Sequence, residues 1–185
     1  MPLNLRRACE ASPSGTKQQS QQNVRLHVPA IHAFEGRRNR REIMRSSARN
    51  QFVGEVVDVK QGAVNDEILL RANDGLEIVA VITHGSAASL GLAAGKAAFA
   101  LVKASSVIVM VDVASSQVSA RNCLAGTVSA VTPGAVNSEV IITVAGGAQI
   151  AAIVTNESTQ RLGLASGKAA MAIFKASSVI IGVDD

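Results

Sequence analysis

The sequence predicts an all-β protein made of two tandem five-stranded barrels that follow a disordered N-terminal leader. The first observation behind this prediction is composition: nearly half of the 185 residues are apolar, yet Trp and Tyr are absent and Phe occurs four times. The core must therefore be built from Val, Ile, Leu and Ala, and the β-branched members of that set favour strands. The other two observations are an internal repeat and the spacing of short apolar runs within each copy.

The repeat covers everything after the leader. Residues 47–112 align with residues 119–184 without a gap, at an offset of 72 positions. Three motifs recur: SARN at 47–50 and 119–122, GAVN at 62–65 and 134–137, and KASSVI at 103–108 and 175–180. Self-similarity at a fixed period indicates two copies of one folding unit. We therefore expect one domain over 47–112 and a second over 119–185.

Five apolar runs within the first copy predict strands. They cover residues 52–60, 67–72, 76–83, 97–103 and 106–112. Turn residues separate the runs, and SAASLGL after the third run predicts a single helical turn with Ser86 as its cap. In EVVDVKQ, alternation places Val57 and Val59 on one face of a strand. Five short strands with one small helix after the third are typical of an OB-like barrel.

The leader over residues 1–43 differs in composition from the repeats. It is rich in Gln, Ser and Arg, contains three prolines and shows no sustained periodicity, which predicts disorder. Three interpretations remain open: a basic tail that contacts nucleic acid or membrane through RRNRRE, a targeting peptide, or a segment that is not translated because translation begins at Met44. Arg41-Glu42 can be encoded AGG-GAG, which resembles a bacterial ribosome-binding site, and this favours the late start.

The basic charge of the chain belongs to the leader. Residues 1–43 hold eight Lys and Arg against three Asp and Glu, whereas residues 44–185 hold ten against eleven. Nucleic-acid surfaces need clustered cations, and OB-type binders of single strands need aromatic stacking platforms. Nucleic-acid binding by the barrels is therefore disfavoured. No apolar run approaches the roughly 20 residues that cross a bilayer, so no membrane-spanning helix is expected.

Catalysis and nucleotide binding are also disfavoured. GLAAGKA at 91–97 is one residue too short for a phosphate-binding loop and lacks its final hydroxyl, so it predicts a turn into the fourth strand with solvated lysines. His84 is the only histidine of the repeats, and the sequence offers no nucleophile–base pair, metal cluster or converging carboxylates. We expect a binding protein rather than an enzyme.

Polar side chains recur at the strand ends of both copies. With the backbone N–H groups that follow the lysines, the candidate site residues are Ser47, Arg49, Thr83, Ser86, Lys103, Ala104, Ser119, Arg121, Thr155, Ser158, Lys175 and Ala176. All of these groups donate hydrogen bonds and none is a carboxylate. Such a set complements a fully deprotonated tetrahedral dianion. The competing interpretation is that the cations solvate strand ends while the hydroxyls cap turns.

The linked motifs decide between these interpretations. SARN-x-[FL]-x-G, GAVN-x-E, [IV]T-x-x-S, LGL-x-x-GK and KASSV occur in this order in both copies and resemble the molybdate-binding Mop or TOBE domain, in the two-copy arrangement of the small molbindins. The resemblance implies OB-like barrels that bind molybdate or tungstate in pockets between neighbouring units. There, Ser and Arg of one unit would meet Thr, Ser and Lys of another.

The resemblance also implies a biological role and an assembly. The leading expectation is a cytoplasmic homotrimer that stores or buffers molybdate, and the alternative is a molybdate-sensing regulatory or transport-associated module. One departure from the family pattern is THGS at 83–86, where the second copy has the commoner TNES at 155–158. We expect His84 to be an exposed loop residue.

Overall fold

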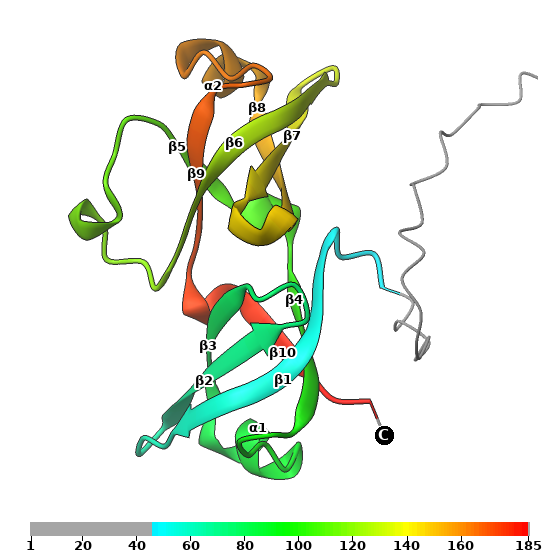
Figure 1. Cartoon of the computed structure of the whole chain (residues 1–185), viewed down its shortest axis with the longest axis vertical. Coiled ribbons are helices and arrows are strands. Elements are labelled where there is room, and N and C mark those ends of the chain that lie inside the picture. The colour runs from blue at the N-terminus through cyan, green and yellow to red at the C-terminus, as the bar shows by residue number, and fades with distance from the viewer. Residues whose placement is uncertain (1–45, 185) are drawn as a thin grey trace, which may run out of the picture. The chain divides into compact units, whose positions relative to one another are not determined.

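The computed structural model describes residues 46–184, and the predicted leader lies outside the described residues. Strands dominate this part of the chain (Figure 1). The strands of the first repeat are β1 (Asn50–Lys60), β2 (Asn65–Ala72), β3 (Glu77–Thr83), β4 (Ala97–Val102) and β5 (Ile108–Met110). Those of the second are β6 (Asn122–Pro133), β7 (Asn137–Val144), β8 (Gln149–Thr155), β9 (Ala169–Phe174) and β10 (Val179–Gly182). The all-β prediction is confirmed.

Helical structure is limited to short segments between strands. These are α1 (His84–Ser89), α2 (Asn156–Arg161), and the 3₁₀ turns η1 (Ala104–Ser106), η2 (Ser115–Gln117), η3 (Ala145–Gly147) and η4 (Ala176–Ser178). None of the helices within residues 46–184 has the length and apolar character needed to span a bilayer.

The two five-stranded sheets exchange their last strands. One sheet has the order β10-β4-β1-β2-β3 and the other the order β5-β9-β6-β7-β8. Figure 1 shows β10, red, beside the green and cyan strands of the first repeat. Two five-stranded barrels are therefore confirmed, but the expectation that each copy supplies all five strands of its own barrel is wrong. The closing segments VIVM and VIIG share their first two residues but end differently. A Cβ atom at Gly182 would lie 2.2 Å from the Phe99 ring, so the glycine of the second copy fits beside β4 of the first, where a larger side chain would clash.

The apolar core fills both barrels and continues between them. Ile68, Leu70 and Ile78 are completely buried in the first sheet, and Val140 and Ile142 are completely buried in the second. Buried and less buried residues alternate along β2 and β7, as expected when one face of a strand packs inward. The inward faces therefore stabilise the fold, while the outward faces and strand ends remain available for binding.

A β-bulge changes the predicted alternation in β1. The register with β2 shifts between Val56 and Asp58, so that Val57 is an extra residue without its own partner. Val56 is buried, and Val59 packs against the core from the other side of the bulge. The expectation that Val57 and Val59 share one face is therefore wrong, because a bulge inserts one residue and reverses the alternation that follows it.

Gly54 lies where the backbone of β2 leaves no room for a side chain on β1. A Cβ atom at this position would lie 2.0 Å from the backbone oxygen of Arg71. We expect Gly54→Ala to lower the free energy of unfolding by about 1–3 kcal/mol, because overpacking forces the backbone to shift. Chemical denaturation measures the change. Gly85→Ala is the control, since nothing lies within 4 Å of its added methyl group. Equal stability of the two variants would contradict this account of Gly54.

The cap of α1 differs from the prediction. Thr83 is the N-cap, and its Oγ1 accepts a hydrogen bond from the backbone N–H of Ser86 at 3.1 Å. Ser86 is therefore not the cap, because the helix begins two residues before it, at His84. His84 is exposed as expected, but it is the first residue of a helix rather than part of a loop.

Candidate anion-binding site

The SARN and KASS segments of the first repeat meet because β1 and β4 pair. Asn50 at the start of β1 is the partner of Val102 at the end of β4. Arg49 therefore lies beside Lys103, the residue that precedes η1. A surface pocket of about 430 Å³ forms at this edge, lined by Ser46, Ser47, Ala48, Arg49, Leu101, Lys103, Ala104, Ser105, Ile153 and Ile180.

The pocket brings together four of the candidate residues. Ser47, Arg49, Lys103 and Ala104 all line it. Ala104 is the first residue of η1, a position whose backbone N–H has no acceptor within its own turn. The pocket thus combines two cationic side chains with shorter hydrogen-bond donors.

The other wall of the pocket comes from the second repeat. Ile153 of β8 lines the pocket, and η1 packs against β8. Thr155 lies two residues further along the same face of this strand, about 7 Å away. Its Oγ1 accepts the backbone N–H of Ser158 at 3.1 Å and donates to the Ser158 hydroxyl at 2.9 Å. Within this chain, the Thr and Ser hydroxyls that lie nearest to Lys103 are therefore those of Thr155 and Ser158 in the second repeat.

The hydroxyl pair of the first repeat lies far from Lys103. Thr83 is the partner of Asn65 at the distal end of β2, whereas Lys103 follows the β4 residue that pairs with Asn50. These ends are separated by the length of β1, which is about 30 Å for some ten residues. Within one chain, Thr83 and Ser86 cannot share an anion with Lys103.

The second repeat has the equivalent arrangement. Asn122 pairs with Phe174, which places Arg121 beside Lys175. The turn η4, which follows Lys175, packs against β3, and β3 ends at Thr83. Ser119, Arg121, Lys175 and Ala176 therefore face the first repeat in the way that Ser47, Arg49, Lys103 and Ala104 face the second. The Ser, Arg, Lys and backbone N–H of each set therefore come from one copy, and within this chain the nearest Thr and Ser come from the other copy. This differs from the arrangement that the family resemblance implies, in which the lysine comes from a different unit than the arginine.

Two buried asparagines fix this geometry. The Asn50 side chain donates to the carbonyl oxygens of Ala151 at 2.9 Å and Val102 at 3.2 Å, and accepts the Ala151 N–H at 2.7 Å. Asn122 bonds both backbone groups of Val79 at 2.8 Å. β8 and β3 are the edge strands of their sheets. Each asparagine therefore pairs with an otherwise open strand edge of the opposite repeat, which holds the neighbouring SARN arginine in place.

A carboxylate accompanies each SARN arginine. Arg49 Nε lies 3.1 Å from Glu139 Oε1, and Arg121 Nη2 lies 2.9 Å from Glu67 Oε1. Sequence reasoning missed both glutamates because each belongs to the other repeat. The available signal was the final residue of GAVN-x-E, which is glutamate in both copies. The asparagine of SARN was missed as well, although it too recurs.

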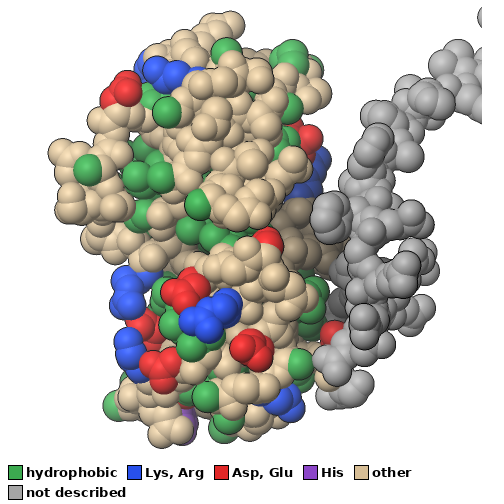
Figure 2. Space-filling view, in the orientation of Figure 1, with side chains coloured by type: hydrophobic (Ala, Val, Ile, Leu, Met, Phe, Trp, Pro, Cys, Tyr) green, Lys and Arg blue, Asp and Glu red, His purple; other side chains and the backbone are tan. Residues whose placement is uncertain are grey.

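The lysines differ from the arginines in their pairing. Within the described residues, the ion pairs involve Arg49, Arg121, Lys60, Arg71 and His84, and neither KASS lysine forms one. Both KASS lysines are exposed to solvent. Figure 2 shows that acidic and basic side chains are interleaved over the first barrel on the face it displays. The pocket lysines are therefore free to pair with a ligand.

The second repeat lacks the titratable pair that accompanies THGS. His84 Nδ1 lies 3.0 Å from Asp66 Oδ2, whereas the equivalent contact joins Ser138 to Asn156 at 2.8 Å. The backbone N–H of Gly62 lowers the pKa of Asp66, burial opposes this shift, and His84 adds to it. The stabilisation from this carboxylate is therefore present above the pKa of an unfolded aspartate and is lost as the pH falls through the lowered value.

Comparison with known proteins identifies the repeat. The TOBE domain model matches residues 46–109 and 118–181. The chain belongs to the TOBE-domain family. Its TOBE repeats are also similar to curated proteins. The chain is 46% identical over 140 residues to molybdenum transport protein ModE of Azotobacter vinelandii, covering 76% of this chain and 52% of that protein.

Two further similarities bear on the TOBE repeats. The molybdenum-pterin-binding protein MopA of Rhodobacter capsulatus is 44% identical over 140 residues, covering 76% of this chain and 53% of MopA. The chain thus spans about half the length of the curated relatives it matches. The solved structure of the cytoplasmic molybdate-binding protein ModG, with molybdate bound, is 48% identical with a TM-score of 0.72 and covers 76% of this chain and 100% of ModG.

Proposed function

We propose that this chain binds molybdate and serves as a cytoplasmic store or buffer of that anion. The observation that carries the proposal is the convergence of Arg49, Lys103 and short hydrogen-bond donors on one pocket, repeated by Arg121 and Lys175. Molybdate is a tetrahedral dianion, and such donors with net positive charge complement it. The similarity to ModG, which holds molybdate in its solved structure, supports the same ligand.

The donor count is adequate for useful affinity. A hydrogen bond to a charged group contributes about 1.5–3 kcal/mol. Five such bonds, reduced by ordering and desolvation costs, reach the roughly 8 kcal/mol that corresponds to micromolar binding. The binding needs no catalytic group, and we assign the chain no enzymatic activity. Tungstate has the same charge and nearly the same size, so it is a second ligand.

The twelve candidate residues remain the proposed contacts. In each pocket the Ser, Arg, Lys and backbone N–H come from one repeat, and the Thr and Ser come from the other repeat or from a neighbouring chain. Exposed apolar residues support association of chains. Ile180 lines the pocket and is 65% exposed, and its equivalent Ile108 is 58% exposed. A homotrimer would cover such surfaces next to the anion.

A second candidate function follows from the length of the relatives. The ModE proteins are about twice as long as the matched region, so the two TOBE repeats would also serve as the molybdate-sensing part of a regulatory or transport protein. The intact mass of the protein from its native host distinguishes the two roles. A mass near 19.1 kDa or lower supports the storage protein, whereas an additional domain supports the sensor. The same measurement decides whether residues 1–43 are present.

Anion selectivity tests the proposed function directly. We expect isothermal titration calorimetry to show tight binding of molybdate and tungstate, weak binding of the smaller sulfate, and little binding of protonated phosphate. Native mass spectrometry with elemental analysis gives the oligomeric state and the bound metal together. Failure of the purified assembly to bind either metal oxyanion, or phosphate binding as tight as that of tungstate, would contradict the proposal.

A further inference from the structure

The SARN arginines already have anionic partners within the chain. Arg49 forms an ion pair with Glu139, in which Nε lies 3.1 Å from Oε1. Arg121 instead uses both terminal nitrogens, which contact the two oxygens of Glu67. The arginine side chains are about half exposed, at 53% and 54%, and the glutamate side chains are 33% and 22% exposed. The arginines are thus accessible to a ligand while they are paired.

The glutamates change the charge that an anion meets. At the first site, Arg49 and Lys103 line the pocket, and Glu139 lies behind Arg49, outside the lining. These three groups carry a net charge of +1, which is less than a dianion requires for neutrality. At the second site, Glu67 pairs with both Arg121 and Lys60. A carboxylate oxygen also offers hydrogen-bond acceptors only. It occupies donors that a fully deprotonated oxyanion would use, and it repels that oxyanion.

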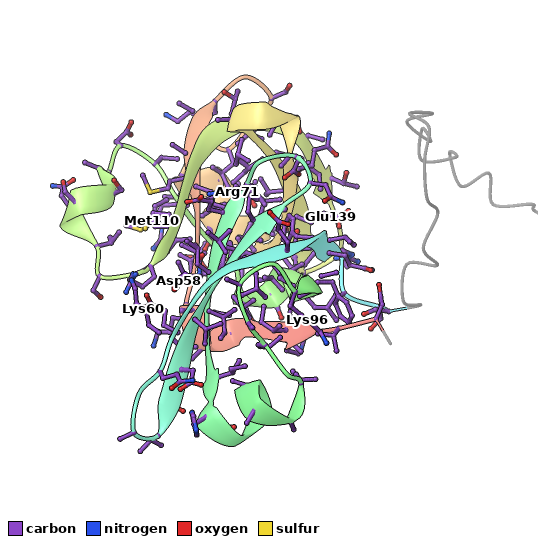
Figure 3. The ribbon with its side chains drawn as sticks, turned by 60° about the horizontal axis from the view of Figure 1, so that its bottom comes forward. Asp58, Lys60, Arg71, Lys96, Met110 and Glu139 are labelled. Atoms are coloured by element: carbon purple, nitrogen blue, oxygen red, sulfur yellow. The ribbon has the colours of Figure 1, made fainter. Side chains whose placement is uncertain are left out.

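The two glutamates accompany two separate SARN arginines. Figure 3 shows Glu139 and Lys60 on opposite sides of the ribbon, and Lys60 Nζ lies 3.5 Å from Glu67 Oε1. Each glutamate comes from the GAVN-x-E motif of the repeat that supplies the opposite wall of its pocket. The same arginine–glutamate contact therefore occurs twice. The two glutamates are 54 and 90 positions away in the sequence from the arginines that they contact.

We propose that Glu139 and Glu67 are specificity-determining residues that compete with the oxyanion for the SARN arginines. Each holds its arginine in position across the repeat boundary and releases part of that contact when the anion binds. The competition lowers the affinity for a dianion and so allows bound anion to be released. This inference rests on the proposed binding of molybdate.

Glu→Gln substitutions test the competition, because Gln keeps the size of the side chain and removes its charge. Exposed ion pairs contribute little to folding stability, so Glu67→Gln and Glu139→Gln are expected to unfold at the wild-type temperature. In the full chain at 150 mM salt, we expect each variant to bind molybdate about three- to tenfold more tightly at the altered pocket. The double variant should show the increase at both.

Perrhenate distinguishes charge competition from a purely structural role of the glutamates, because a structural change would not alter the affinities of the two anions according to their charge. It is a tetrahedral monoanion, and Coulomb energy is proportional to the charge of the ligand. Removal of a neighbouring negative charge should therefore increase perrhenate affinity by a factor of only about the square root of the factor for molybdate. Glu77→Gln is the matched control. It removes one charge and an ion pair with Arg71 at 2.8 Å, but Glu77 lies about 13 Å from Glu67 along the sheet face.

The outcomes separate this inference from the proposed function. Tighter molybdate binding by the pocket variants, with a smaller increase for perrhenate and no change in Glu77→Gln, supports the competition. Unchanged or weaker molybdate binding by the Glu→Gln variants, or equal increases in affinity for the two anions, overturns the competition. In that case, molybdate binding by the wild-type chain still upholds the proposed function. A wild-type chain that does not bind molybdate overturns both.

Discussion

Replacing Lys103 and Lys175 together with alanine is expected to abolish most molybdate binding while the fold stays intact. Both lysines are exposed and lie at strand ends, and neither forms an ion pair within the described residues. Their removal therefore costs the fold little. A charge-assisted hydrogen bond contributes about 1.5–3 kcal/mol, so each pocket should bind molybdate about 10- to 150-fold more weakly.

Titration calorimetry measures this loss, and a second pair of lysines supplies its control. Lys96 and Lys168 lie in the turns before β4 and β9, outside the lining of the pocket. The double variant Lys96→Ala with Lys168→Ala removes the same total charge and should keep wild-type affinity. If the Lys103 and Lys175 variant also bound molybdate as the wild type does, those lysines would not be ligands of the anion.

Replacing Asn50 with alanine is expected to cause a large loss of stability. Its side chain is 2% exposed and makes three hydrogen bonds, two of which reach Ala151 on the edge of β8. Alanine would leave these backbone groups buried without partners. Each unsatisfied group costs about 1–3 kcal/mol, so we expect a loss of about 3–5 kcal/mol, a large part of the stability of an ordinary domain.

Urea denaturation measures the effect, and Gln51→Ala is the control. Gln51 is the next residue, but its amide bonds only to the nearby carbonyl oxygens of Ala48 and Ser46. That variant should lose less than about 1 kcal/mol. Asn122→Ala should behave like Asn50→Ala, since it makes the equivalent contacts with Val79. If Asn50→Ala lost as little stability as Gln51→Ala, the backbone groups at the edge of β8 would have other hydrogen-bond partners.

Local pattern in the sequence was sufficient for the strands and turns. The apolar runs predicted the strands of the first repeat to within a few residues, and GLAAGKA was correctly predicted as a turn into β4, where Gly95 has a φ of +81°. The bulge at Val57 and the cap at Thr83 were missed. The bulge depends on the strand register, and the cap depends on the residue at which the helix begins. A shift of either by one residue hardly changes the pattern of residue types, so the sequence does not reveal it.

The chain by itself determined the repeat and the all-β class, and it predicted the candidate donors, because these follow from residue types at short spacing. Only the tertiary structure decided which donors meet. Arg49 finds Glu139, Asn50 finds Ala151, and β10 completes the sheet of β4, all across the repeat boundary. The two copies are identical at about half of their aligned positions, and both carry SARN and GAVN-x-E, so these motifs alone offer the same partners within and between repeats. The choice depends on long-range packing: β10 pairs with β4, η1 packs against β8 and η4 packs against β3, and these contacts set which groups meet.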